Sequence, residues 1–223
     1  MISENDTSKN DFKTDSSQSI IGKLINFLNI HLQTFPSAYK QMPSSTKVDN
    51  EDDITQDLTN YLQDHTYKDG FFMFQFQRRK RKTRRSSDIG IIARGYASYE
   101  AFFVIEAKRL PADRKSREKE YVQGNGGGIE RYKRGHHGAG LPQSAIIGYI
   151  QKENCSYWHV EINNWINELI SSNADSEIIW NKTDLLKQTE DFGKTKKYSS
   201  KNTRIVNSKP DVIFLHHYLM ELN

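Results

Sequence analysis

Three charged residues stand at the ends of two apolar segments of the chain. The segment AFFVIEAKRL, residues 101–110, carries Glu106 and Lys108 directly after its apolar run, and Asp88 opens the earlier segment DIGIIA. Side chains alternate along a strand, so Glu106 and Lys108 project from the same face. If the two segments pair as adjacent strands, the carboxylates of Asp88 and Glu106 converge beside the lysine.

Converging carboxylates repel each other unless a cation lies between them. Oxygen ligands without histidine or cysteine suit Mg²⁺ best, with Mn²⁺ as an alternative ion. A lysine beside that ion can orient and help deprotonate an attacking water, and it offsets charge on a phosphate in the transition state. Taken alone, however, Glu106 and Lys108 favour an ion pair at a sheet edge, and it is the position of Asp88 that favours a metal site.

A third acid precedes the apolar stripe of a predicted helix, NEDDITQDLTNYLQDH at residues 50–65, which Asn50 is placed to cap. The stripe consists of Ile54, Leu58, Tyr61 and Leu62. At about 100° per residue, Glu51 lies roughly 20° from Leu58 and faces inward, whereas Asp52 and Asp53 lie more than about 100° away. The alternative is that these acids only favour the positive end of the helix dipole.

The other segments predict the elements that position these residues. We expect a helix from about Ile20 that ends before Pro36, a helix starting at Ile129, and a helix over residues 156–170. The predicted strands are residues 70–77, 88–93, 101–110, 144–150 and 212–215. Residues 172–202 are polar and ambiguous.

This pattern predicts an α/β protein with a central mixed sheet flanked by helices. Residues 1–18 are predicted to form a mobile arm, and residues 19–223 one domain. Within that domain, residues 19–49 supply the first helix and a connector, and residues 50–150 the catalytic core.

Glu51, Asp88 and Glu106-Ala107-Lys108, in this order, resemble the active-site signature of the PD-(D/E)XK nuclease superfamily, which has the restriction-endonuclease-like fold. The succession of helix, strand, Glu-x-Lys strand, helix and strand over residues 50–150 is similar to the core of that superfamily. Ser87 stands where the motif's name gives proline. The resemblance implies that Asp88 and Glu106 are Mg²⁺ ligands, Lys108 the catalytic lysine, and Glu51 an auxiliary acid within the ligand set.

The resemblance further implies a Mg²⁺-dependent nuclease that hydrolyses phosphodiester bonds in DNA, in defence against foreign DNA or in DNA repair. Two alternatives stay open. One is a catalytically silent nucleic-acid-binding or assembly module of the same fold, and the other is an RNA-directed nuclease. A homodimer or a partner subunit is compatible with each of them.

The block RRKRKTRR at residues 78–85 has seven basic side chains in eight positions, too many for local acids to pair. Next to a phosphodiester site we expect it to contact phosphate, the alternative being a solvated loop. Basic residues of the helix from Ile129 form a second candidate surface. The predicted nucleic-acid contacts are Arg78, Arg79, Lys80, Arg81, Lys82, Arg84, Arg85, Arg131, Lys133 and Arg134.

Other patterns carry less chemistry. The glycine-rich GNGGGIERYKRG lacks the ending of an NTPase phosphate loop, and Glu130 within it is a weak site candidate. The pairs His136-His137 and His216-His217 diverge on any regular backbone, so we expect surface or loop histidines and not metal ligands.

Composition sets the broad class. The chain has 32 Lys plus Arg against 28 Asp plus Glu, a modest excess that favours polyanionic partners. The single cysteine, Cys155, excludes an internal disulfide and fits a reducing compartment. The N-terminal residues lack the layout of a secretory signal, and no apolar run approaches the roughly 20 residues that cross a bilayer. We therefore expect a soluble cytoplasmic protein with no membrane partner.

Overall fold

The computed structural model of this 223-residue chain describes residues 8–43, 50–66, 70–79, 86–95, 100–124, 127–172, 177–205 and 209–223. The side chains of residues 8–19, 78, 79 and 86 are outside the description. The helices are α1 (Ser8–Gln41), α2 (Glu51–Thr66), α3 (Gly128–Lys133) and α4 (Cys155–Ser172), with a 3₁₀ turn, η2, at Lys115–Arg117. The strands are β1 (Phe72–Arg79), β2 (Ser86–Ala93), β3 (Phe103–Leu110), β4 (Gln143–Ile150), β5 (Lys187–Asp191), β6 (Thr195–Thr203) and β7 (Val212–Glu221).

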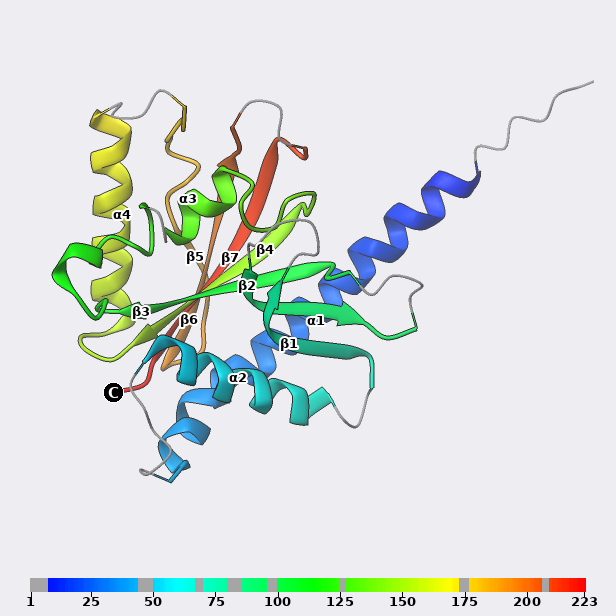
Figure 1. The fold of residues 1–223 in the computed structure, drawn as a ribbon, viewed down its shortest axis with the longest axis horizontal. Helices are drawn as coiled ribbons and strands as arrows, with labels where there is room; N and C mark the ends of the chain where they lie inside the picture. The colour runs from blue at the N-terminus through cyan, green and yellow to red at the C-terminus, as the bar shows by residue number, and fades with distance from the viewer. Residues whose placement is uncertain are drawn as a thin grey trace, which may run out of the picture.

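All the strands listed belong to one seven-stranded sheet with the order β1-β2-β3-β4-β7-β6-β5 (Figure 1). Strands β3, β4 and β7 run parallel at its centre, and the pairs toward both edges are antiparallel. The predicted α/β class with a mixed, helix-flanked sheet is therefore confirmed. None of the described helices is both long and apolar enough to cross a membrane.

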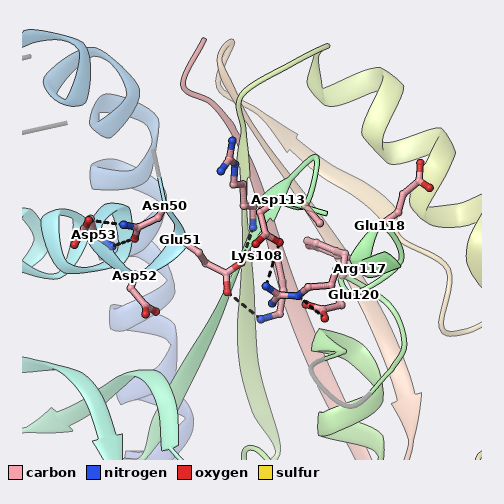
Figure 2. A pocket seen from close by; sticks show the side chains of 12 residues that line it. Asn50, Glu51, Asp52, Asp53, Lys108, Asp113, Arg117, Glu118 and Glu120 are labelled. Carbon is pink, nitrogen blue, oxygen red and sulfur yellow. Dashed lines mark hydrogen bonds and ion pairs between the residues drawn. The ribbon is translucent and has the colours of Figure 1, made fainter. Parts of the chain in front are cut away.

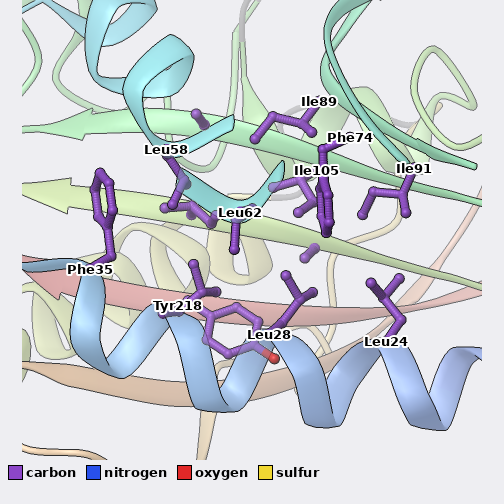
Figure 3. Close-up of a cluster of buried hydrophobic side chains, with 14 of the residues drawn as sticks. Leu24, Leu28, Phe35, Leu58, Leu62, Phe74, Ile89, Ile91, Ile105 and Tyr218 are labelled. Carbon is purple, nitrogen blue, oxygen red and sulfur yellow. The ribbon is translucent and has the colours of Figure 1, made fainter. Parts of the chain in front are cut away.

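Each face of the sheet is covered by its own pair of helices. Helices α1 and α2 pack on one face, where Leu28, Leu58 and Ile105 belong to one buried apolar cluster (Figure 3). Helices α3 and α4 contribute to a second cluster that includes Ile129 and Ile166. Because the central strands are covered on both faces, they are apolar along most of their length, as the sequence indicated.

Helix α1 continues through Pro36 to Gln41, so the prediction that it ends before Pro36 is wrong. Proline has no N–H, and the carbonyl of Leu32 one turn earlier therefore loses its usual helical donor. The buried hydroxyl of Thr195 on β6 donates to that carbonyl at 2.8 Å. Phe35 and Tyr39 remain buried on either side of the proline, so packing against the sheet favours the continued helix. Residues 8–18, expected to be part of a mobile arm, are the first turns of α1.

Helix α2 begins at the predicted position. The side-chain Oδ1 of Asn50 accepts from the amide of Asp53 at 2.8 Å, and the Asn50 carbonyl accepts from the amide of Ile54. This cap satisfies amides that have no partner inside the helix. It also fixes Glu51 as the first helical residue, at the end of α2 that lies beside β3.

Strands β5 and β6 lie in the segment that the sequence left ambiguous. Several buried residues of β6 are polar, so the strand shows no apolar alternation in the sequence. Among them, Lys197 pairs with Glu190 of β5, and Ser200 hydrogen-bonds to His217. Strand β7 extends over Val212–Glu221, well beyond the predicted residues 212–215. It therefore places both His216 and His217 inside the sheet.

Candidate active site

Strand β3 presents Glu106 and Lys108 on one face, as alternation predicts. Phe103, Ile105 and Ala107 belong to the cluster under α1 and α2, and Val104 and Leu110 to the cluster on the opposite face. Glu106 and Lys108 share the parity of Val104 and Leu110. The Lys108 Nζ lies 3.0 Å from Glu106 Oε1, and the exposed fractions of the two side chains are 7% and 0%.

Asp88 lies on β2 next to this pair. Strands β2 and β3 are antiparallel, with Ile89 opposite Ile105, so Asp88 is adjacent to Glu106 across the ladder. The Asp88 Oδ2 accepts from the backbone amide of Ala107 at 2.8 Å. The sequence thus correctly anticipated that the two carboxylates converge.

Glu51 reaches the same lysine from the start of α2 (Figure 2). Its Oε1 lies 3.2 Å from Lys108 Nζ, and its Oε2 accepts from the backbone amide of Arg109 at 2.9 Å. Glu51 faces the sheet as predicted, while Asp52 is exposed. The structure therefore brings Glu51, Asp88, Glu106 and Lys108 together from one helix and two strands.

Two further residues of this cluster were not expected to contact Glu106. Arg131 on α3 donates from a guanidinium nitrogen to Glu106 Oε1 at 2.8 Å. His137 has a side chain that is only 1% exposed, and its Nδ1 lies 2.6 Å from Glu106 Oε2. Apart from this short contact, neither Glu106 Oε2 nor the ring nitrogens of His137 has a hydrogen-bond partner.

The loop that carries His137 is fixed by backbone contacts. The Arg131 carbonyl accepts from the amides of His136 and His137 at 2.8 and 3.2 Å. The buried guanidinium of Arg204 donates to the carbonyls of Gly138 and Leu141 at 2.6 and 3.1 Å. No local sequence pattern signals this arrangement, because its partners are separated by more than 60 residues along the chain.

The cluster shifts the pKa values of its members strongly. Burial, helped by the charge of Glu106, raises the pKa of Asp88 to about 7. Burial also opposes ionisation of Glu106, but Lys108, with His137 and Arg131, lowers the pKa of Glu106 to about 2. For Lys108 burial acts to lower the pKa, yet Glu106, Glu51 and Asp88 together raise it above its ordinary value. Glu106 and Lys108 are therefore charged at neutral pH. Asp88, with a pKa near 7, is only partly ionised at that pH.

A cleft of about 430 Å³ opens beside Lys108 (Figure 2). Its lining has six acidic and three basic side chains. Part of this charge is paired, because Arg117 bridges Asp113 and Glu120 at 3.1 and 2.6 Å. The lining residues are Asn50, Glu51, Asp52, Asp53, Lys108, Arg109, Ala112, Asp113, Arg117, Glu118, Glu120 and Tyr121.

The donor chemistry of the cluster fits a hard divalent ion on two carboxylates. In the described part of the chain, no group of three or more His, Cys, Asp and Glu side chains is arranged to hold a metal ion. Mg²⁺, however, is commonly held by one or two carboxylates, with water and substrate phosphate as its other ligands. Asp88, whose raised pKa reflects burial beside another acid, and Glu106, whose Oε2 has His137 Nδ1 at 2.6 Å as its one close polar neighbour, are the two carboxylates that could take this role. Glu51 is engaged by Lys108 and Arg109, so it is the least available of the three acids.

The predicted nucleic-acid surface is described only in part. Lys80, Arg81, Lys82, Arg84 and Arg85 lie outside the described residues, and Arg78 and Arg79 are described only as the backbone that ends β1. In the register of the β1–β2 hairpin, Arg78 stands opposite Ser87 and Arg79 opposite Ser86. The basic block therefore connects β1 to the strand that carries Asp88.

The second predicted basic surface differs from expectation. Lys133 is fully buried, and its Nζ lies 2.7 Å from Asp184 Oδ1, so a phosphate contact would require this pair to open. We therefore leave Lys133 out of the proposed nucleic-acid surface. Arg134 is 24% exposed and bridges Glu130 and Glu177. Arg131 is 25% exposed and points toward Glu106, which makes it the member of this set nearest the cluster.

The histidine pairs are also more buried than expected. His217 is inaccessible to solvent, and its two ring nitrogens lie 3.0 Å from the Tyr121 hydroxyl and 2.8 Å from Ser200 Oγ. Burial lowers the pKa of His217 to about 3, so it is a neutral core residue. The expectation of surface or loop histidines is wrong for His217, which lies in β7, whereas His137 does lie on a loop but is buried. The physical reason is that Tyr121 and Ser200 are hydrogen-bonded to the two ring nitrogens of His217, so this polar side chain can be buried in the sheet.

Comparison of the chain with protein-family models, curated proteins and solved structures gave no match.

Proposed function

We propose that this protein is a Mg²⁺-dependent nuclease that hydrolyses phosphodiester bonds in DNA. The observation that carries the proposal is the convergence of Asp88, Glu106 and Lys108 from adjacent strands, with Glu51 added from α2. With β1 added, the order α2, β1, β2, β3, α3, β4 contains the succession of helix, strand, Glu-x-Lys strand, helix and strand that resembles the PD-(D/E)XK core, and this supports our proposal of a restriction-endonuclease-like fold. Defence against foreign DNA and DNA repair are the proposed settings.

The charge of the cleft supports a requirement for a metal ion. Acidic side chains outnumber basic ones in its lining, so a phosphodiester entering alone would be repelled. Asp88 and Glu106 would hold the ion, with Glu51 as an auxiliary acid. When bound, the ion would act as a Lewis acid on the phosphate and lower the pKa of a water molecule.

Lys108 is suited to binding charge and not to removing a proton. Its pKa is raised, so the ammonium persists at neutral pH. Glu106 and Glu51 occupy two of its three N–H donors. The third can donate to a phosphate oxygen or orient a water in the cleft, which stabilises the negative charge of the transition state. This favours orientation and charge stabilisation over the deprotonation of water.

A specific observation favours the alternative of a catalytically silent nucleic-acid-binding or assembly module. Glu106 is fully buried and already contacts three cationic or protonatable side chains, Lys108, Arg131 and His137. Such a network resembles a buried polar core that specifies packing. A module of this kind would bind nucleic acid equally well with and without a divalent ion.

One experiment separates these functions. The protein is incubated with supercoiled plasmid, linear duplex, single-stranded DNA and RNA, each with Mg²⁺, with Mn²⁺ and with EDTA, and products are resolved on gels. We expect cleavage of DNA that depends on the ion. Binding without cleavage under all conditions would support the silent module, and cleavage confined to RNA would support the RNA-directed nuclease.

A further inference from the structure

Arg131 contacts one of the two oxygens of the carboxylate that the proposed metal ion would use. Its guanidinium donates to Glu106 Oε1 at 2.8 Å, and the same oxygen lies 3.0 Å from Lys108 Nζ. The Glu106 side chain has no exposed surface, whereas that of Arg131 is 25% exposed. Arg131 therefore extends from the protein surface to a buried acid.

The backbone of Arg131 is held independently of this contact. Its backbone amide donates a hydrogen bond to the carbonyl of Gly127, and its carbonyl accepts from the backbone amides of His136 and His137. A change of partner by the guanidinium consequently needs rotation of a long side chain and no movement of α3. Lys108 differs in this respect, because it is 7% exposed and held between two carboxylates.

Electrostatics makes the contact conditional. Three acidic side chains, Glu51, Asp88 and Glu106, face Lys108, Arg131 and the ring of His137, so Arg131 offsets part of the negative charge of the cluster. A divalent ion on Asp88 and Glu106 would add two positive charges within a few ångströms of the guanidinium. Like charges at such distances in a poorly solvated site repel strongly. The ion and Arg131 therefore compete for Glu106.

We propose that Arg131 exchanges partners, holding Glu106 when no divalent ion is bound and contacting a backbone phosphate of the nucleic acid when the ion binds. This inference rests on the proposed function and adds a role to it. A guanidinium fork matches phosphate oxygens, and its exposed side already faces solvent. The exchange couples binding of the ion to binding of nucleic acid, and such coupling is reciprocal.

The first test measures Mg²⁺ affinity by calorimetry without nucleic acid. Arg131→Gln removes the competing cation and should bind Mg²⁺ about tenfold more tightly than the wild type, the equivalent of one charged hydrogen bond. Arg134→Gln is the matched control, because Arg134 lies on the same turn, is equally exposed and is paired with Glu130 and Glu177 instead. Its Mg²⁺ affinity should stay within about twofold of the wild type, since it removes the same charge without uncovering Glu106.

A structural role for Arg131 predicts the opposite sign. If Arg131 only positions Glu106, Arg131→Gln will bind Mg²⁺ as weakly as the wild type or more weakly, and the inference is then wrong. Thermal melting by circular dichroism establishes that each variant is folded. Arg131→Lys serves if the Gln variant does not fold: it keeps the charge but loses the fork, and it should also bind Mg²⁺ more tightly than the wild type, by less than tenfold.

The second test measures binding of a fluorescein-labelled DNA duplex by anisotropy, in EDTA and with Ca²⁺, over a range of salt concentrations. Assays are kept short enough that a denaturing gel shows the duplex intact. In the wild type, Ca²⁺ should steepen the log–log salt slope by about 0.9, the value for one added phosphate contact. Relative to the wild type, Arg131→Gln should show no such steepening. Equal changes of slope in both proteins would overturn the proposed exchange.

Failure of this inference differs from failure of the proposed function. If the wild-type protein binds no divalent ion, both the proposed function and the exchange are wrong, because Arg131 then has no ion to exchange with. If the wild-type protein binds Mg²⁺ and cleaves DNA, but Arg131→Gln binds Mg²⁺ no more tightly, only the proposed exchange is wrong.

Discussion

Among the residues that the structure describes, two lysine–carboxylate pairs are buried, and the pKa values of their members move in opposite directions. Lys108 and Glu106 lie 3.0 Å apart, and Lys133 and Asp184 lie 2.7 Å apart. In the first pair the pKa of the lysine is raised and that of the glutamate lowered to about 2, so both charges are reinforced. In the second pair burial lowers the pKa of Lys133 and raises that of Asp184, so both groups move toward their neutral forms.

The surroundings explain the difference. Lys108 and Glu106 have further charged neighbours in Glu51, Asp88 and Arg131, and these offset the desolvation of each ion. Lys133 has one carboxylate partner and the ring of Trp180, whose centroid lies 4.7 Å from its Nζ. An isolated pair recovers less of the cost of burial than a network does.

The comparison separates the pair that we propose for catalysis from a pair with a structural role. The first pair lies beside a polar cleft that includes Lys108, and its charges persist at neutral pH. The second pair has no exposed surface and fastens α3 to the turn in which Asp184 accepts from the amide of Asn181 at 2.7 Å. Burial of a lysine and an acid together is therefore no sign of catalysis without a network of charges and access to solvent.

The largest effect is expected from Glu106→Gln. It should abolish ion-dependent cleavage, because a neutral amide is a poor ligand for a hard cation. It should also lower the free energy of unfolding by about 3 kcal/mol at pH 7, since Lys108 and Arg131 lose a common anionic partner. Gel assays and urea unfolding measure the two effects. Asp184→Asn is the matched control; cleavage should persist in that variant, and retained cleavage in Glu106→Gln would exclude the proposed site.

Lys108→Met should slow cleavage by two to three orders of magnitude, roughly the effect of removing one charge-stabilising donor from a transition state. Affinity for Mg²⁺ should be kept or increased, because the variant removes a cation and no ligand. Single-turnover kinetics and calorimetry give the two quantities. If Mg²⁺ affinity were lost while turnover stayed normal, the assignment of roles within the cluster would be wrong.

Asp88→Asn should stabilise the protein in a pH-dependent way. The folded-state pKa of Asp88, about 7, lies above its ordinary value of 3.8. Between these values the folded protein holds a proton that the unfolded chain has lost, so the stability contributed by Asp88 falls as pH rises through this window. Asn cannot ionise, and it should raise the unfolding free energy by about 4 kcal/mol at pH 8 but by only about 2 kcal/mol at pH 5.

Urea unfolding at the two pH values tests this expectation, and the gain should come with a loss of cleavage. A gain that is equal at pH 5 and pH 8 would show that Asp88 is not held near Glu106 as a charged group. Asp184→Asn is not a matched control for this effect, because the Asp184 carboxylate has a cationic partner, Lys133 Nζ, at 2.7 Å.

The smallest effect is expected from neutralising the second pair as a whole. Lys133→Met combined with Asp184→Asn leaves no buried ion at this position. The new side-chain amide oxygen can still accept from the backbone amide of Asn181. Replacing a whole buried pair is usually far less costly than breaking it, so stability should change by less than about 2 kcal/mol and cleavage should be unaffected. A large loss of cleavage with intact folding would extend the functional cluster to Lys133.

Local sequence was sufficient for the parts of this protein that depend on near neighbours in the chain. Alternation along residues 101–110 placed Glu106 and Lys108 on one face of β3, and Asn50 marked the start of α2 with Glu51 turned inward. The apolar runs of β2, β3 and β4 identified strands covered on both faces. These features follow from periodicity and capping, which act over a few residues.

Tertiary structure decided which groups surround Glu106 and which polar residues are buried. Arg131 and His137 meet Glu106 only because β4 runs parallel to β3 and places α3 over it, and Lys133 on the same helix turns to Asp184 instead of to solvent. Helix α1 passes Pro36 because a hydroxyl from β6, far along the chain, replaces the missing amide. In each case the stabilising partner is distant in sequence, so no local pattern records it, and only the folded chain determines where these charges and hydrogen bonds are satisfied.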